Sequence, residues 1–151
     1  MTVIKYGLGT AQLGQIYGIS SRKNIYSLSE TKKLINIIHK FPNKIDLIDT
    51  AQLYGESEDL LGKVDTKSIK IITKISIDFN KGNIRNQIIN KLNLSLLKLK
   101  KKKIYGLLIH NPPTLNISSI SELYDILLDL KENKIIGNFG LSIYDPSDLE
   151  L

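Results

Sequence analysis

Four polar residues end or follow apolar segments of the chain, and their types suit acid–base chemistry. Asp49, Lys74 and His110 each end such a segment, and Tyr54 follows Asp49 on the next loop. A charge at the end of a buried strand is costly unless it is paired, so we expect Asp49 and Lys74 to pair. An ammonium near a phenol stabilises the phenolate, as a tyrosine acting as general acid requires. We predict that Tyr54 protonates a carbonyl oxygen that His110 also contacts.

Reduction of that carbonyl also needs a hydride, which no side chain supplies, so the prediction includes a nicotinamide cofactor. Each residue alone has a structural interpretation. Asp49 and Lys74 suit a structural ion pair, His110 before Asn-Pro-Pro suits a turn, and Tyr54 suits a loop aromatic. Four such groups at one end of a parallel sheet favour the catalytic interpretation. Ser142, which ends another apolar segment, either joins them or bonds local backbone.

The sequence lacks the residue types or spacings that several other kinds of functional site require. The chain has no cysteine, which excludes disulfides, a thiolate nucleophile and cysteine-ligated metals. The two histidines, His39 and His110, lack zinc-type spacing, so we expect no metal site. The segment 7–12 begins like a dinucleotide fingerprint, but its third glycine is replaced by Gln12. A Rossmann phosphate turn is therefore not predicted.

Charge and hydropathy limit the possible partners. The net charge is +6, from 21 Lys and Arg against 15 Asp and Glu, and much of it lies in the run 98–103. We interpret this run as the solvated end of a helix, where cations are favourable. Nucleic-acid surfaces usually carry arginine, and Arg22 and Arg85 lie outside the run, so we expect no nucleic acid as a partner.

No apolar stretch reaches the roughly 18–20 residues of a membrane span, and no signal peptide is evident. We expect a cytoplasmic protein without a membrane partner.

Apolar strand-like segments alternate with helical patterns along the whole chain. This order is typical of a parallel sheet covered by helices, and no linker divides the chain. A five-stranded doubly wound sheet fits the count, and so does part of a (β/α)8 barrel, which needs about 250 residues when complete. The expected strands are 3–9, 45–49, 69–74, 104–110 and 135–142, and the expected helices are 27–41, 57–62, 84–92 and 119–130.

Helix-start signals support these boundaries. Ser27 to Glu30 and Ser119 to Glu122 each have the residue types of a capping box. Asp145 followed by proline predicts the start of another helix. The sequence ends at Leu151, within two turns of that start. So short a helix has too few turns and contacts to offset the unfavourable free energy of helix nucleation. We therefore expect the chain to be part of a longer barrel protein.

At the candidate residues the sequence resembles the aldo-keto reductase family over nearly its whole length. The segment 48–58, Ile-Asp-Thr-Ala-Gln-Leu-Tyr-Gly-Glu-Ser-Glu, resembles the strongest family signature, Asp-Thr-Ala-x-x-Tyr-Gly-x-Ser-Glu. The segments 7–14, 72–74, 108–112 and 140–142 resemble further family segments in the same order. Each piece is short, but the ordered set is specific.

The resemblance implies a fold, a catalytic set and a cofactor. The fold is the α/β (β/α)8 TIM barrel, of which the chain holds about the first five strands and four helices. The catalytic tetrad is Asp49, Tyr54, Lys74 and His110, with Tyr54 as the proton donor. The cofactor is NADPH or NADH, without a metal. The residues implied near the nicotinamide ribose and carboxamide are Gly9, Thr10, Ala11, Asp49 and Ser142.

The resemblance also implies what the protein acts on. Residues 1–151 correspond to the N-terminal portion of one barrel domain, and the substrate is a small aldehyde or ketone. Some features are similar to bacterial members encoded with surface-sugar biosynthesis enzymes, which suggests a sugar-derived carbonyl. Family members hold the adenosine phosphate on later strands, so we expect this chain alone to bind cofactor poorly and to be inactive. The alternative is a non-catalytic half-barrel that binds a partner.

Overall fold

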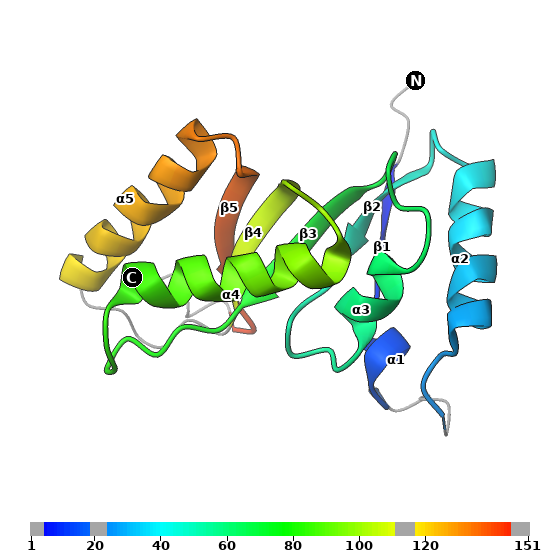
Figure 1. Cartoon of the computed structure of the whole chain (residues 1–151), viewed down its shortest axis with the longest axis horizontal. Coiled ribbons are helices and arrows are strands. Elements are labelled where there is room, and N and C mark those ends of the chain that lie inside the picture. The colour runs from blue at the N-terminus through cyan, green and yellow to red at the C-terminus, as the bar shows by residue number, and fades with distance from the viewer. Residues whose placement is uncertain (1–4, 19–23, 111–116, 146–151) are drawn as a thin grey trace.

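The computed structural model describes residues 5–18, 24–110 and 117–145, with the side chains of 117–119 left out. Five parallel strands form one sheet in the order β1-β2-β3-β4-β5. The helices that follow the strands lie on one face of this sheet (Figure 1). The strands are β1 (Tyr6–Gly9), β2 (Ile45–Asp49), β3 (Lys70–Ile75), β4 (Ile104–His110) and β5 (Ile136–Ser142). The helices are α1 (Ala11–Gly14), α2 (Leu28–Lys40), α3 (Ser57–Gly62), α4 (Ile84–Leu99) and α5 (Ile117–Glu132).

Strand order decides between the two predicted architectures. A doubly wound sheet reverses direction at a switch point, so its strand order does not follow the sequence. Here each strand pairs with the one that follows it in the sequence, with no reversal. The sheet is therefore the sequentially ordered part of a (β/α)8 barrel. The barrel prediction is confirmed, and the doubly wound alternative is wrong.

Helix starts match the prediction at one capping box and differ at the other. The Ser27 hydroxyl accepts from the Glu30 amide, and the Glu30 carboxylate accepts from the Ser27 amide. The second predicted box is wrong, because α5 begins at Ile117 and Ser119 lies inside the helix. The short helix α1 was not predicted. The helix start predicted at Asp145 depends on the following proline, which lies outside the described residues.

The two faces of the sheet have different compositions. Ile48, Ile75, Leu107 and Ile109 alternate along their strands and are fully buried, as expected under the helices. Residues paired in register share a face, and the opposite face includes Gly9, Asp49, Ile72, Gly106 and Asn138 as one such row.

Glycine on this opposite face makes room for larger neighbours. A Cβ at Gly106 would lie 3.0 Å from Cγ1 of Ile72, and one at Gly7 would lie 2.9 Å from Cδ2 of Leu47. The alternation of glycine and large aliphatic residues fills the interior of a small barrel. The same face ends, at the carboxyl edge of the sheet, in the polar candidates.

Candidate active site

Asp49 and Lys74 form an ion pair at the carboxyl ends of β2 and β3. The Lys74 Nζ lies 2.6 Å from Oδ2 of Asp49 and donates to the Thr50 carbonyl oxygen at 3.2 Å. The Lys74 side chain is 7% exposed and that of Asp49 is 36% exposed. A buried ammonium needs such partners, because its loss of hydration is otherwise uncompensated. The predicted pairing is thus present in the structure.

Tyr54 lies on the loop between β2 and α3, directly beside Lys74. Its hydroxyl oxygen is 3.4 Å from Lys74 Nζ, and the same nitrogen lies 5.0 Å from the ring centroid. The ammonium therefore contacts both the phenol oxygen and the face of the ring, an arrangement that attracts a cation. One lysine links the carboxylate and the phenol.

Two glycines allow the loop that carries Tyr54 to lie against α1. A Cβ at Gly14 would overlap the carbonyl oxygen of Tyr54, and a Cβ at Gly55 would overlap the carbonyl oxygen of Gly14. Gly55 also has φ of 55°, a left-handed conformation that glycine adopts readily. This close backbone contact fixes the position from which Tyr54 reaches Lys74.

His110 ends β4 and completes the group. Its ring lies edge-on to Tyr54, with centroids 5.9 Å apart and an interplanar angle of 90°. The side chain is buried, and its Nδ1 has no hydrogen-bond partner within the described residues. Burial, and then the charge of Lys74, lower the pKa of His110 below 6.5, although Asp49 opposes the shift. The imidazole is therefore neutral near pH 7.

A buried chain of hydroxyl groups supports this edge of the sheet, and sequence reasoning missed it. The Ser57 hydroxyl donates to Oγ1 of Thr10 at 2.9 Å and lies 3.0 Å from Oγ1 of Thr50. Thr10 in turn donates to the Asp49 carbonyl oxygen at 2.9 Å. The chain joins the first turn of α3 to the ends of β1 and β2, and so holds the backbone of Asp49.

A second buried contact joins α3 to β3. The Thr73 hydroxyl donates to Oε1 of Glu58 at 2.6 Å, and Glu58 is only 1% exposed. Thr73 immediately precedes Lys74, so this bond fixes the strand backbone next to the ammonium. Ser57 and Glu58 belong to the segment on which the family resemblance rests, but nothing in their spacing indicated these partners.

The residues expected at the cofactor lie along the same edge. Gly9 pairs in register with Asp49, and a Cβ built on Gly9 would meet no atom within 4 Å. Ser142 pairs in register with His110, and Ala11 is half-buried at the start of α1. The Thr10 hydroxyl is already used within the protein. The space over Gly9, beside the partly exposed Asp49, is therefore open.

Comparison with known proteins identifies the family. The family model of the aldo/keto reductases matches residues 5–151, so the chain belongs to the aldo/keto reductase family. A solved structure from Pseudomonas aeruginosa, assigned to the aldo-keto reductases, has 29% identity and a TM-score of 0.72, covering 90% of this chain and 54% of its own. No curated protein matches the sequence.

Two further solved structures support the fold at lower identity. An aldo-keto reductase from Bacillus halodurans in its holo form has 20% identity and a TM-score of 0.73, covering 97% of this chain and 48% of its own. One from Klebsiella pneumoniae in complex with NADPH has 16% identity and a TM-score of 0.66, covering 95% and 47%. The chain therefore spans about half the length of these structures.

The described residues contain neither a candidate membrane span nor a candidate metal cluster. None of their helices combines the length and the hydropathy that a bilayer crossing requires. Within the same residues, no group of three or more histidine, aspartate and glutamate side chains is placed to hold a metal ion.

Proposed function

We propose that this chain contributes the proton-transfer site of an NAD(P)H-dependent reductase that converts an aldehyde or ketone to an alcohol. The observation that carries the proposal is the position of Lys74, whose Nζ contacts both Asp49 and the hydroxyl of Tyr54. A structural ion pair requires only the carboxylate. A phenol held at the same ammonium supports acid catalysis.

Each member of the group has a separate task. Tyr54 donates a hydrogen bond to the substrate oxygen and then the proton. The Lys74 ammonium stabilises the phenolate that remains, and Asp49 holds Lys74 in place. His110, neutral because its pKa is lowered, donates a second hydrogen bond and fixes the direction of the carbonyl. Two donors aimed at one oxygen stabilise the charge that develops there.

The cofactor in this proposal is NADPH or NADH, which supplies the hydride when bound. Gly9, Thr10 and Ala11 would border its nicotinamide ribose with Asp49, and Ser142 would contact the carboxamide. The free space over Gly9 supports this arrangement. A small carbonyl compound, including one derived from a sugar, is the proposed substrate, and the cytoplasm is the proposed location.

We also propose that residues 1–151 form the N-terminal portion of a single barrel domain. In the described sheet, β1 and β5 are edge strands, which present unpaired backbone groups. Leu47, Ile72 and Leu108, on the face opposite the helices, are only half-buried. Further strands would cover both features. The chain alone is then expected to bind cofactor weakly and to be inactive.

One experiment separates the reductase from a half-barrel that only binds a partner. The whole protein that contains this chain is mixed with NADPH or NADH and a panel of aldehydes and ketones, and alcohol formation is measured together with cofactor oxidation. The reductase produces the two in equal amounts. If neither changes, although fluorescence titration shows that the cofactor binds, the binding module is favoured instead.

A further inference from the structure

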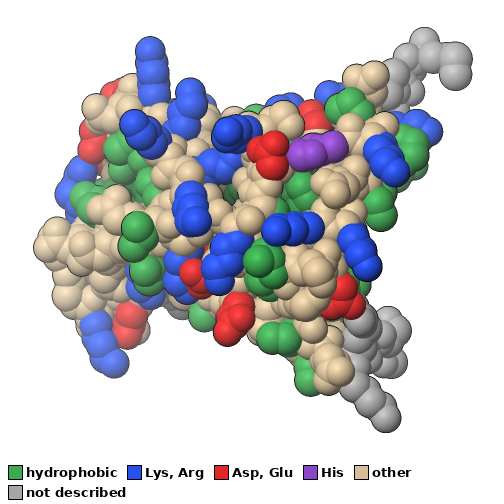
Figure 2. Space-filling model, turned by 45° about the vertical axis from the view of Figure 1, so that its right-hand side comes forward, with side chains coloured by type: hydrophobic (Ala, Val, Ile, Leu, Met, Phe, Trp, Pro, Cys, Tyr) green, Lys and Arg blue, Asp and Glu red, His purple; other side chains and the backbone are tan. Residues whose placement is uncertain are grey.

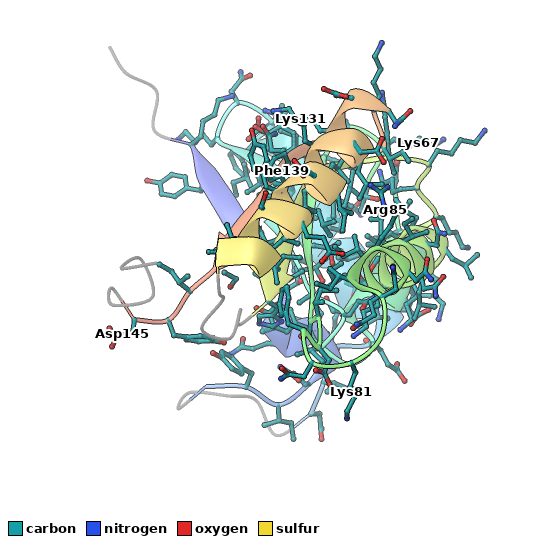
Figure 3. The ribbon with its side chains drawn as sticks, turned by 90° about the vertical axis from the view of Figure 1, so that its left-hand side faces the viewer. Lys67, Lys81, Arg85, Lys131, Phe139 and Asp145 are labelled. Carbon is teal, nitrogen blue, oxygen red and sulfur yellow. The ribbon has the colours of Figure 1, made fainter. Side chains whose placement is uncertain are left out.

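A hollow in the described structure lies at the end of the sheet opposite the candidate active site. It has a volume of about 780 Å³ and lies at the amino-terminal ends of β3, β4 and β5. Figure 3 places Lys67 and Lys131 at this end and Lys81, on the loop after β3, at the other. The lysines that line the hollow are Lys67, Lys70, Lys100, Lys101, Lys102, Lys103, Lys131 and Lys134.

The charge of this lysine hollow is almost uncompensated. No acidic residue is among those that line it, and among its eight lysines only Lys70 has a described carboxylate partner, Asp46 at 2.9 Å. Lys101 donates to the Thr66 carbonyl oxygen at 2.6 Å, and burial lowers the pKa of Lys101, although the charge of Asp65 opposes the shift. Figure 2 shows several Lys and Arg side chains near one another in the upper half of the molecule. Like charges held this close repel one another unless an anion joins them.

Backbone conformation gives a second, independent observation. Lys100 has φ of 52° and Lys134 has φ of 58°, and they are the only residues other than glycine with positive φ in the described part of the chain. Each follows a helix that ends in the same pair of hydrogen bonds. After α4 the Lys100 and Lys101 amides donate to Leu97 and Leu96, and after α5 the corresponding donors are Lys134 and Ile135.

Glycine is the usual residue at such a helix end, because a side chain is strained there. Glycine does occupy the other described positions with positive φ, at Gly18, Gly55 and Gly82. The favourable interaction of cations with helix ends does not require lysine at the strained position itself. Strained backbone that persists often has a functional reason. Both strained residues are lysines that line the same hollow, so each adds a positive charge to it.

We propose that the lysine hollow binds a soluble anion that carries several phosphate groups. A single negative charge would leave most of the ammonium groups unneutralised. Lysine binds phosphate as a point charge, without the fixed geometry of arginine, which suits a cluster of phosphates. This site is separate from the proposed reductase function and does not depend on it.

Other occupants fit the hollow less well. Its isoleucines, at positions 69, 71, 104 and 136, are each at most 6% exposed, so they offer the apolar face of an amphipathic acidic peptide little surface. Its one aromatic residue, Tyr105, has Lys70 Nζ 5.2 Å from its ring centroid, which disfavours stacking of nucleic-acid bases. A concave site also matches a compact anion better than a flat membrane surface.

The test is calorimetric titration of the whole protein that contains this chain with inorganic tripolyphosphate at low salt. The double variant Lys100→Gly and Lys134→Gly is expected to bind about tenfold more weakly, while its melting temperature stays the same or rises, because glycine relieves the strained backbone. Lys100→Gln with Lys134→Gln, which removes the charge but keeps a flexible polar side chain at each position, is expected to lose the same affinity. The control is Lys32→Gln with Lys33→Gln on α2, which removes the same charge from exposed positions elsewhere.

The outcomes are distinct. Weaker binding in both hollow variants, with the control unchanged, supports the site. Failure of the unaltered protein to bind tripolyphosphate, or equal loss in the control, overturns it. A lower melting temperature in the glycine variant overturns the strain argument. Tighter binding of hexaglutamate than of tripolyphosphate would show that the ligand is an acidic peptide, and tighter binding of single-stranded RNA would show a nucleic acid; either result contradicts the phosphate proposal.

Discussion

The ammonium nitrogen of Lys74 lies 2.6 Å from the Asp49 carboxylate, although 25 positions separate the two residues in the sequence. Two buried hydrogen bonds fix the strand backbone at and next to this ion pair. Thr10 donates to the Asp49 carbonyl oxygen and Thr73 donates to Glu58. The charged side chains therefore have little freedom to separate, and the ammonium stays within reach of the phenol.

Removal of the Asp49 charge tests this arrangement. Asp49→Asn leaves a neutral amide beside the buried ammonium, so we expect the free energy of unfolding of the chain to fall by about 1–3 kcal/mol. The whole protein is expected to lose catalytic rate as well, because Lys74 is then free to turn away from Tyr54. Urea unfolding measures the first effect and steady-state kinetics the second. Unchanged values of both would mean that Asp49 does not position Lys74.

His110 gives a prediction about pH. Because burial and Lys74 lower its pKa in the folded chain, the unfolded chain binds a proton more readily. The contribution of neutral His110 to the free energy of unfolding is therefore fully present above about pH 6.5, the pKa in the unfolded chain. This contribution is lost as the pH falls from there through the lower pKa of the folded chain. Histidine ring signals in NMR are expected to give His110 a midpoint below 6.5. His110→Gln should remove this part of the pH dependence, and a midpoint above 6.5 contradicts the prediction.

Two glycine substitutions distinguish a glycine required for close backbone packing from a glycine that borders the proposed cofactor site. Gly14→Ala forces a Cβ into the Tyr54 carbonyl oxygen, so we expect about 1–3 kcal/mol of destabilisation. Gly9→Ala meets no atom within 4 Å, so stability should change by less than about 0.5 kcal/mol. In the whole protein, however, Gly9→Ala should raise the KM for the cofactor. If Gly9→Ala destabilises the chain and leaves cofactor binding intact, the space over Gly9 is not the cofactor site.

The buried hydroxyl chain predicts a cost for a small change. Ser57→Ala removes the group that joins Thr10 and Thr50 and leaves two buried hydroxyls with fewer partners, at about 1–3 kcal/mol. Ser121→Ala, at an exposed position of α5, serves as the control and should be nearly neutral. Thermal unfolding of the two variants compares them directly. Equal stabilities would show that the hydroxyl chain does not hold this edge of the sheet.

Local signals allowed much of the fold to be predicted from the sequence. The strand 45–49 and the helix 57–62 have the predicted bounds, because apolar runs and a closing glycine mark them. The capping box at Ser119 failed because the pattern Ser-x-x-Glu also occurs inside a helix, and α5 begins earlier. The one-turn helix α1 is too short to have periodicity.

Only some contacts of the candidate site could be predicted from the sequence. The pairing of Asp49 with Lys74 was predictable because both end neighbouring strands. The bond between Thr73 and Glu58 was not, because neither residue type indicates which partner the fold supplies. The run 98–103 alone predicts a helix end, because the positions of Lys67 and Lys134 beside it depend on the fold.

The most direct test of the central claim is the rate of carbonyl reduction by the whole protein with Tyr54→Phe. The change removes only the phenol oxygen that lies 3.4 Å from Lys74 Nζ. We expect the catalytic rate to fall by about 10²–10⁴-fold, the usual contribution of a positioned acid, with cofactor affinity retained. Tyr124→Phe, at an exposed position of α5, should keep full activity. Full activity in Tyr54→Phe would contradict the assignment of Tyr54 as the proton donor.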